Sequence, residues 1–255
     1  MRKFGFLSLF LLAFFALAIP ASTPAQVAVG ISVHIGPPPL RVYAQPICPG
    51  PDYMWTPGYW AYGDAGYYWV PGAWVMAPQP GLLWTPGYWG FVGGVYAWHA
   101  GYWGPHIGFY GGINYGFGYG GVGFAGGEWR GGHFFYNTAV AHVNVNIIHN
   151  TYVNRTVIVN NNSHVAFNGE GGVRAQPTRE EMAAEHEQHF QPTNAQMNHE
   201  HTAMARPENH AENSNRANNR QQPHNNQARA QHNNNKQHQE KSKPQRKPDD
   251  HPRDR

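Results

Sequence analysis

The sequence predicts a mainly β protein: an antiparallel meander of tandem tryptophan-repeat strands, extended by a glycine/aromatic segment and followed by a polar, largely disordered C-terminal tail that carries short helices. Three observations support this fold class. A six-residue tryptophan motif recurs four times, 30 of the 36 aromatic residues lie between residues 26 and 170, and Phe190 is the sole aromatic residue of the segment 171–255. Glycine and proline clusters between short apolar segments are typical of strands joined by turns.

The N-terminus has the pattern of an export signal. Arg2 and Lys3 precede an apolar run from Phe4 to Ile19, and small residues follow up to Ala25. This run of about 16 residues is shorter than the ~20 that a membrane-spanning helix needs. We therefore interpret residues 1–25 as a signal peptide cleaved after Ala25. The exported protein is then periplasmic or secreted, with association with the outer membrane left open and no transmembrane helix after signal cleavage.

One strand and no disulfide are expected before the first motif. From Val27 to Ile35, valine and isoleucine alternate with small or polar residues, which is the period of a half-buried strand, and Pro37 to Pro39 end it. Cys48 is the only cysteine, so no internal disulfide can hold the fold. Packing has to do so instead.

The motif W-x-x-G-x-W occurs at residues 55–60, 69–74, 84–89 and 98–103, and its copies begin 14, 15 and 14 residues apart. Turn-forming glycines and prolines separate the copies, so each is predicted to form one short strand of an antiparallel meander. The two tryptophans of a copy are five residues apart and would face opposite sides of a regular strand. Because a Pro-Gly pair between them disrupts strand pairing, we expect a bulge that can bring both rings to one side.

These motifs resemble the bacterial YXWGXW, or WXXGXW, repeat-containing proteins, which join a signal peptide to tandem units of this kind. The pattern is matched residue by residue at Trp55/Gly58/Trp60, Trp69/Gly72/Trp74, Trp84/Gly87/Trp89 and Trp98/Gly101/Trp103. The resemblance implies export and repeats, and it implies no reaction.

The rest of the β domain, which we place at residues 26–170, is predicted from two patterns. Residues 104–132 contain 13 glycines among aromatic residues, a density that disfavours helix. Alternation at 143–147 and a β-branched run at 151–159 predict a pair of strands that closes the domain.

The tail, residues 171–255, is of low complexity and too polar to bury a core, so we expect disorder. It contains a tandem repeat, in which residues 176–190 and 191–205 are identical at six of 15 positions. Both copies have the spacing of a helix capping box, Thr178 with Glu181 and Thr193 with Gln196. Short helices are therefore predicted at 178–190 and 193–206, although isolated helices of this length are marginal.

Charge gives no support to nucleic-acid binding. The formal charge of +3 consists of +2 in the signal, −1 in the β domain and +2 in the tail, so the mature protein is close to neutral. We expect no nucleic-acid partner, and name cell-wall glycan or envelope proteins as the candidate partners.

No catalytic pattern is evident in the sequence. The β domain has four acidic and three basic residues, with no nucleophile elbow and no phosphate-binding loop. Glu128, Arg130 and His133 around Trp129 form its one polar cluster, which we interpret as a surface loop or ion pair. We expect neither enzymatic activity nor a cofactor.

Two kinds of binding residue are candidates. Flat indole rings stack on sugars, so the motif tryptophans are candidate ligand-binding residues, unless they form the core. These are Trp55, Trp60, Trp69, Trp74, Trp84, Trp89, Trp98 and Trp103. Clustered histidines bind transition metals, and the candidate ligands are His186, His189, His199 and His201. The first two are three residues apart and so lack the four-residue spacing of zinc-protease helices.

The sequence thus favours an exported structural or interaction protein of the cell envelope. A carbohydrate-binding module that uses tryptophan faces is the alternative, and a His-rich metal-binding protein is the second alternative.

Overall fold

A computed structural model describes residues 31–157 and 163–211, and the mainly β fold is confirmed. The predicted signal peptide, residues 27–30 of the strand expected from Val27 to Ile35, and residues 212–255 lie outside the described residues; of the described part of that strand, Ser32 and Val33 form β1. The strands are β1 (Ser32–Val33), β2 (Tyr53–Thr56), β3 (Tyr59–Gly63), β4 (Gly66–Val70), β5 (Ala73–Met76), β6 (Leu83–Thr85), β7 (Tyr88–Val92), β8 (Val95–His99), β9 (Tyr102–Gly104), β10 (Asn114–Gly116), β11 (Tyr119–Gly120), β12 (Gly127–Arg130), β13 (His133–Asn137), β14 (Thr151–Tyr152) and β15 (Phe167–Gly169). They are followed by α2 (Arg179–Ala184), α3 (Asn194–Met204) and the 3-10 helix η2 (Pro207–Asn209). Within the described residues, no helix has the length and apolarity to cross a membrane.

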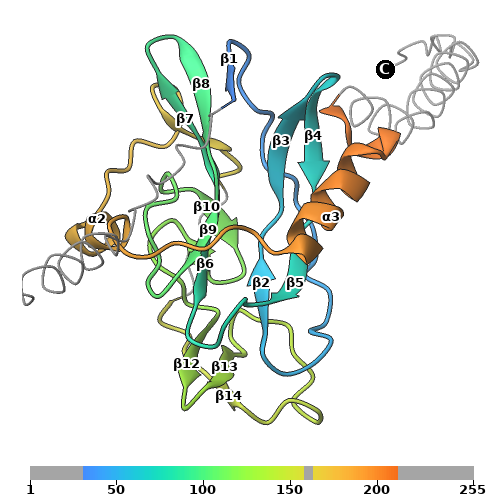
Figure 1. Ribbon diagram of the computed structural model, residues 1–255, viewed down its shortest axis with the longest axis vertical. Coiled ribbons are helices and arrows are strands. Elements are labelled where there is room, and N and C mark those ends of the chain that lie inside the picture. The colour runs from blue at the N-terminus through green and yellow to red at the C-terminus, as the bar shows by residue number, and fades with distance from the viewer. Residues whose placement is uncertain (1–30, 158–162, 212–255) are drawn as a thin grey trace, which may run out of the picture. The chain divides into compact units, whose positions relative to one another are not determined.

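The four motifs form two nested hairpins. In the first hairpin unit, residues 53–76, β3 pairs with β4 and β2 pairs with β5; in the second hairpin unit, residues 83–104, β7 pairs with β8 and β6 with β9. Figure 1 shows the two units side by side. The antiparallel arrangement is confirmed, but each motif supplies two strand segments rather than one. Pairing stays within a unit, so β5 and β6 do not continue a single meander.

The expected bulge is absent from both units. Thr56 pairs with Ala73 on one side of the interruption and Tyr59 pairs with Val70 on the other, so the step is three residues on both strands and none is inserted. This register places Pro57 opposite Gly72. Both strands therefore break their ladder at the same level, which we call the waist of the hairpin unit, and the pairing resumes in register beyond it.

Glycine is required at the waist because an indole ring of the paired motif covers it. A Cβ atom on Gly58 would lie 2.5 Å from the ring of Trp69 and 3.0 Å from the backbone nitrogen of Gly72. Gly72 is covered in the same way by Trp55. The second unit repeats the arrangement, with Trp98 over Gly87 and Trp84 over Gly101. The first tryptophan of each motif thus packs on the glycine of the motif paired with it.

Since the hairpins continue in register through the waist, the two rings of one motif enter different apolar clusters. Each tryptophan pairs across the strands with a ring of the other motif, with centroids 5.3 or 5.4 Å apart. The pairs Trp55–Trp74 and Trp84–Trp103 belong to one apolar cluster, and the pairs Trp60–Trp69 and Trp89–Trp98 belong to the other.

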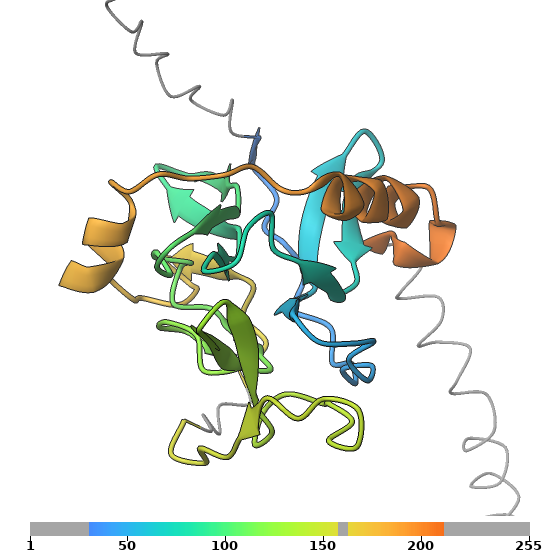
Figure 2. The same cartoon turned by 60° about the horizontal axis from the view of Figure 1, so that its bottom comes forward.

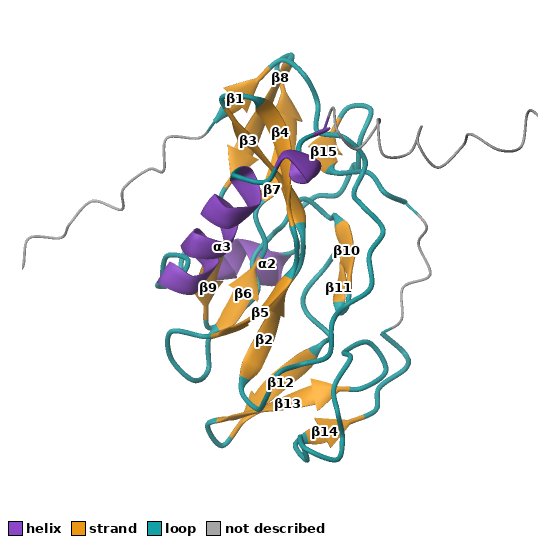
Figure 3. Cartoon of the chain, turned by 90° about the vertical axis from the view of Figure 1, so that its right-hand side faces the viewer, coloured by secondary structure: helices purple, strands orange, loops and turns teal. Residues whose placement is uncertain are grey.

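Other segments extend and cover the hairpins. β1 pairs antiparallel with β8, and β15 pairs parallel with β7, which makes a four-stranded sheet around the inner part of the second unit. The glycine/aromatic segment, including β10 and β11, lies on the side of the hairpin strands opposite the helices (Figure 3). Its buried tyrosines bond to the hairpin backbone: Tyr115 donates to the carbonyl of Gly87 over 2.7 Å, and Tyr119 to that of Trp84 over 2.8 Å.

The strand predicted at 143–147 is wrong. This segment turns, because Asn144 accepts hydrogen bonds from the backbone nitrogens of Ile147 and Ile148 through its carbonyl and from Asn146 through its side chain. Asparagine favours such local turns over a strand ladder. Of the run predicted at 151–159, Thr151 and Tyr152 form β14, which pairs parallel with β13, and residues 158–162 lie outside the described residues.

The two tail helices are confirmed, each with its capping box at Thr178 and Thr193. Both are shorter than predicted. The docking of residues 171–211 was not predicted: Ala184 and Ala203 are buried, and the segment packs along the hairpin units (Figures 1 and 2). Polar side chains of the helices find partners on the strands, a source of stability that composition does not reveal.

We expect Gly58→Ala to lower the free energy of unfolding by about 1–3 kcal/mol, because its Cβ overpacks the waist against Trp69. Urea denaturation followed by tryptophan emission measures the change. Gly50→Ala is the matched control, since its Cβ would meet only the ring of Tyr53 at 3.9 Å. Equal stability of the two variants would refute the role assigned to the waist glycine.

Candidate functional site

The eight candidate tryptophans form the core rather than an exposed surface. Trp55, Trp60, Trp69, Trp84, Trp89 and Trp103 are between 0 and 8% exposed, and Trp74 and Trp98 are half-buried. Across residues 31–157 and 163–211, no Phe, Trp or Tyr side chain falls in the exposed class. A stacking platform for a glycan needs an open ring face, and among the eight tryptophans only Trp74 and Trp98 are more than 8% exposed.

A cavity of about 110 Å³ lies between the waists of the two hairpin units. The waists contribute Pro57, Pro71, Pro86 and Ala100 to its wall. Aromatic side chains of both units and of β10 line it further: Tyr59, Trp84, Trp98 and Tyr115. Proline has no backbone N–H, so much of this wall offers no hydrogen-bond donor.

Helix α3 closes the cavity with three polar side chains, Gln196, His199 and Glu200. Gln196 accepts a hydrogen bond from the indole nitrogen of Trp103 over 2.8 Å, and the Nε2 atom of His199 lies 2.8 Å from the carbonyl oxygen of Pro71. Because one contact is to the second unit and the other to the first, α3 bridges the two hairpin units.

Glu200 is the charged residue of the cavity wall. Its Oε2 accepts from the hydroxyl of Tyr59 over 3.0 Å, and its Oε1 accepts from that of Tyr68 over 3.2 Å. Burial, and then the negative charge of Glu200, raise the pKa of Tyr59 well above its usual range. Tyr59 therefore stays a neutral donor, and the two tyrosines fix the orientation of the carboxylate.

The cavity lies where the motif departs from its commonest form, WTPGYW. Ala73 takes the position that is tyrosine in the other three copies, and Ala100 takes the position that is proline in them. Both alanines line the cavity, as does Val70, which replaces threonine. The two alanines are smaller than the tyrosine and the proline of the other copies, which leaves space between the waists.

The four candidate metal-ligating histidines are not brought together. His186 and His201 are exposed, His199 contacts Pro71, and His189 stacks on Tyr102 with ring centroids 3.6 Å apart. Within the part of the chain that the structure describes, no three His, Cys, Asp or Glu side chains are grouped to hold a metal ion.

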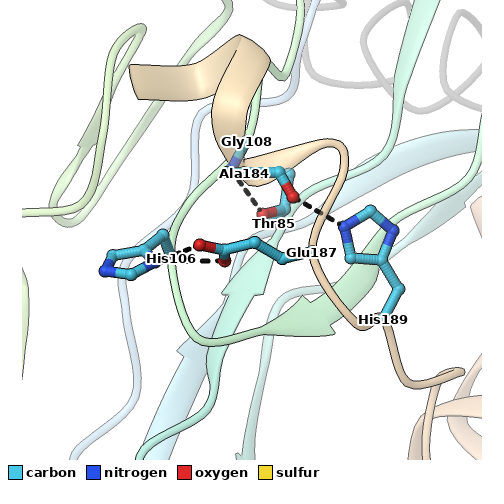
Figure 4. Close-up of polar contacts among 6 residues, drawn as sticks. All are labelled: Thr85, His106, Gly108, Ala184, Glu187 and His189. Atoms are coloured by element: carbon cyan, nitrogen blue, oxygen red, sulfur yellow. Dashed lines mark hydrogen bonds and ion pairs between the residues drawn. The ribbon is translucent and has the colours of Figure 1, made fainter.

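Figure 4 shows the contact of His106 with Glu187, which links the loop after β9 to the segment after α2, and the contact of His189 with Ala184 within the tail. The Nε2 atom of His189 lies 2.9 Å from the carbonyl oxygen of Ala184, and His106 Nδ1 lies 2.8 Å from Glu187 Oε1. Thr85 accepts from the backbone nitrogen of Gly108 over 3.0 Å and so holds the loop that carries His106. The role of these side chains in this geometry is to dock the tail.

The polar cluster at Glu128 is an ion pair on the hairpin formed by β12 and β13. Arg130 bonds to Glu128, and both side chains are about half exposed. His133 lies 3.6 Å from Asp52, which also accepts from the backbone nitrogen of Phe134. The geometry matches the surface ion pair expected from the sequence.

The fold and this site define a β protein built from hairpins whose tryptophans pair across the strands on both sides of the waist. The family model described as the WXXGXW repeat matches the chain in two copies, at residues 50–75 and 80–103. The chain thus carries the WXXGXW repeat, and the resemblance seen in its motifs is confirmed. Each copy of the family model coincides with one hairpin unit, so the repeating unit is a pair of motifs. Neither a curated protein nor a solved structure matches the chain.

Sequence reasoning missed Glu200 and Ala73 as residues of the site. The signal for Ala73 was present, because it is a small residue at a position that is tyrosine in the other copies. No signal placed Glu200 near Tyr59, since 141 residues separate them and only the folded chain brings α3 across the hairpins.

The buried tyrosines predict alkaline unfolding. Burial raises the pKa of Tyr43 to about 12, whereas an unfolded tyrosine ionises near 10. The contribution of neutral Tyr43 to the free energy of unfolding is therefore complete below pH 10. It is lost as the pH rises toward 12, and the loss is on the order of 2 kcal/mol. In an alkaline pH titration, we expect the absorbance of tyrosinate to increase over the same pH range in which the circular dichroism signal of the fold is lost. Ionisation of most tyrosines near pH 10 with the fold intact would contradict this assignment.

Proposed function

We propose that this chain is an exported protein of the cell envelope with a structural or interaction role, in which the hairpin units form a rigid framework for the surrounding segments. The observation that carries the proposal is the pairing and burial of the motif tryptophans. Their rings stabilise the framework, so contacts with partners fall to other surfaces and to the tail.

The framework suits a chain with no internal disulfide. A buried tryptophan removes ~150–250 Å² from water, which at ~25 cal/mol per Å² stabilises by about 4–6 kcal/mol as an upper estimate. Six such rings lie in two apolar clusters that span both units. Packing alone therefore provides the rigidity that small exported domains often obtain from disulfides.

Export is the part of the proposal that rests on residues 1–25. We expect fractionation of the native cells to place the protein in the periplasm, the outer-membrane fraction or the medium, and mass spectrometry of its N-terminus to give Gln26. The reason is the sequence pattern of a basic start, an apolar run and small residues up to Ala25. An intact Met1 on a cytoplasmic protein would refute export.

Glycan binding by the motif tryptophans is tested separately. Because those rings are buried, we expect cell-wall glycan to leave tryptophan emission unchanged and a polymer column not to retain the protein. Trp74→Phe probes a half-buried ring, and Trp103→Phe, a buried one, is the control. Retention that Trp74→Phe abolishes and Trp103→Phe preserves would favour the carbohydrate-binding alternative.

A further inference from the structure

We propose that the cavity between the two waists binds an organic ammonium group, with the carboxylate of Glu200 as its counter-ion. The match to the WXXGXW repeat assigns no function to this cavity. It rests on the charge, the donors and acceptors, and the size of the cavity.

Glu200 supplies a negative charge that no ion pair of the described residues neutralises, and the one potentially cationic side chain beside it in the wall, His199, contacts the carbonyl oxygen of Pro71 through Nε2. Residues 31–157 and 163–211 contain three ion pairs, and none of them involves Glu200. Its two bonds come from the neutral hydroxyls of Tyr59 and Tyr68, which leave lone pairs on both carboxylate oxygens. A half-buried carboxylate gains from a cation that replaces lost hydration.

The rest of the wall favours a cation with an apolar body over an anion. No lysine or arginine lines the cavity, and the waist prolines lack an N–H donor. Aromatic rings attract cations, and prolines and rings also pack against methylene groups. An alkylammonium group satisfies both demands, because its charge pairs with Glu200 while its carbon chain contacts the wall.

Size restricts the ligand to a short chain. The cavity of about 110 Å³ is smaller than an engineered cavity of about 150 Å³ that takes up benzene, and well below the ~300 Å³ at which drug-sized pockets begin. This volume favours a short alkyl chain such as that of butylammonium over a sugar ring. Two sources carry this chemistry, a free small amine and a lysine side chain. Lysine is absent from residues 31–157 and 163–211, so the described chain does not supply one.

The experiment titrates the mature chain with butylammonium chloride and with the uncharged analogue butanol, near neutral pH, by isothermal calorimetry. We expect saturable binding of the amine at millimolar concentration and none of butanol. Emission of Trp84 and Trp98, which line the cavity, provides a second readout. Titration with Nα-acetyl-lysine amide, which keeps its ε-ammonium group, separates a free small amine from a lysine side chain as the source. A lysine of a polypeptide has to enter with its backbone attached.

Two variants test the site independently. Glu200→Gln keeps an acceptor for a tyrosine hydroxyl but removes the charge, and we expect at least tenfold weaker binding. Ala73→Tyr restores the residue of the other three copies and fills the space, so we expect binding to be lost with the fold unchanged by circular dichroism. Glu180→Gln, an exposed residue of α2, is the matched control and should bind as the original chain does.

Three results would overturn the proposal: butanol binding as well as the amine, no saturable heat, or unchanged affinity in both Glu200→Gln and Ala73→Tyr. The cavity would then be only the space that α3 leaves when it docks. A failure of this test leaves the export and framework proposals unaffected, since they depend on residues 1–25 and on the buried rings.

Discussion

The contact on which the structure depends is an indole ring lying on a glycine of the opposite strand. Each hairpin unit has two such contacts, related by the exchange of its two motifs. They hold the strands together at the level where proline prevents regular hydrogen bonding. They also fix the spacing of the motif, because the first tryptophan has to reach across while the second pairs with a ring beyond the waist. The four tryptophan pairs and both apolar clusters follow from this arrangement.

The tail repeat and the hairpin repeat correspond to each other, because each copy of the tail repeat contacts one hairpin unit. Glu200 of α3 bonds to Tyr59, which follows the waist glycine of the first unit. Its counterpart in the tail repeat, Glu185, lies near Tyr88, which holds the same place in the second unit and whose pKa is raised by burial and then by that carboxylate. The glutamate after α2 thus lies near the tyrosine of the second hairpin unit, and the glutamate of α3 bonds to the tyrosine of the first hairpin unit. Two duplications in the sequence form one arrangement in space.

Local patterns predicted much of this structure, and long-range contacts account for what they missed. The motif, its glycines and the capping boxes at Thr178 and Thr193 act over a few residues and were readable. The waist was misread as a bulge because its geometry depends on the paired motif as well as its own. The docking of residues 171–211 onto the hairpins was not predicted, because their composition lacks apolar groups. Their partners are tyrosine hydroxyls, an indole nitrogen and a proline carbonyl on distant strands.

The reach of Glu200 across 141 residues has a temporal consequence. The strand pairing between the two motifs of a hairpin unit lies within about two dozen residues, so it can form as soon as that stretch of chain is free, because local contacts form fast. The wall formed by α3 is the last to arrive, since residues 191–205 follow everything else that encloses the cavity. A chain that is truncated before α3 keeps both hairpin units but leaves the space between them open to solvent. Closure of that space therefore requires the chain up to and including the second copy of its tail repeat.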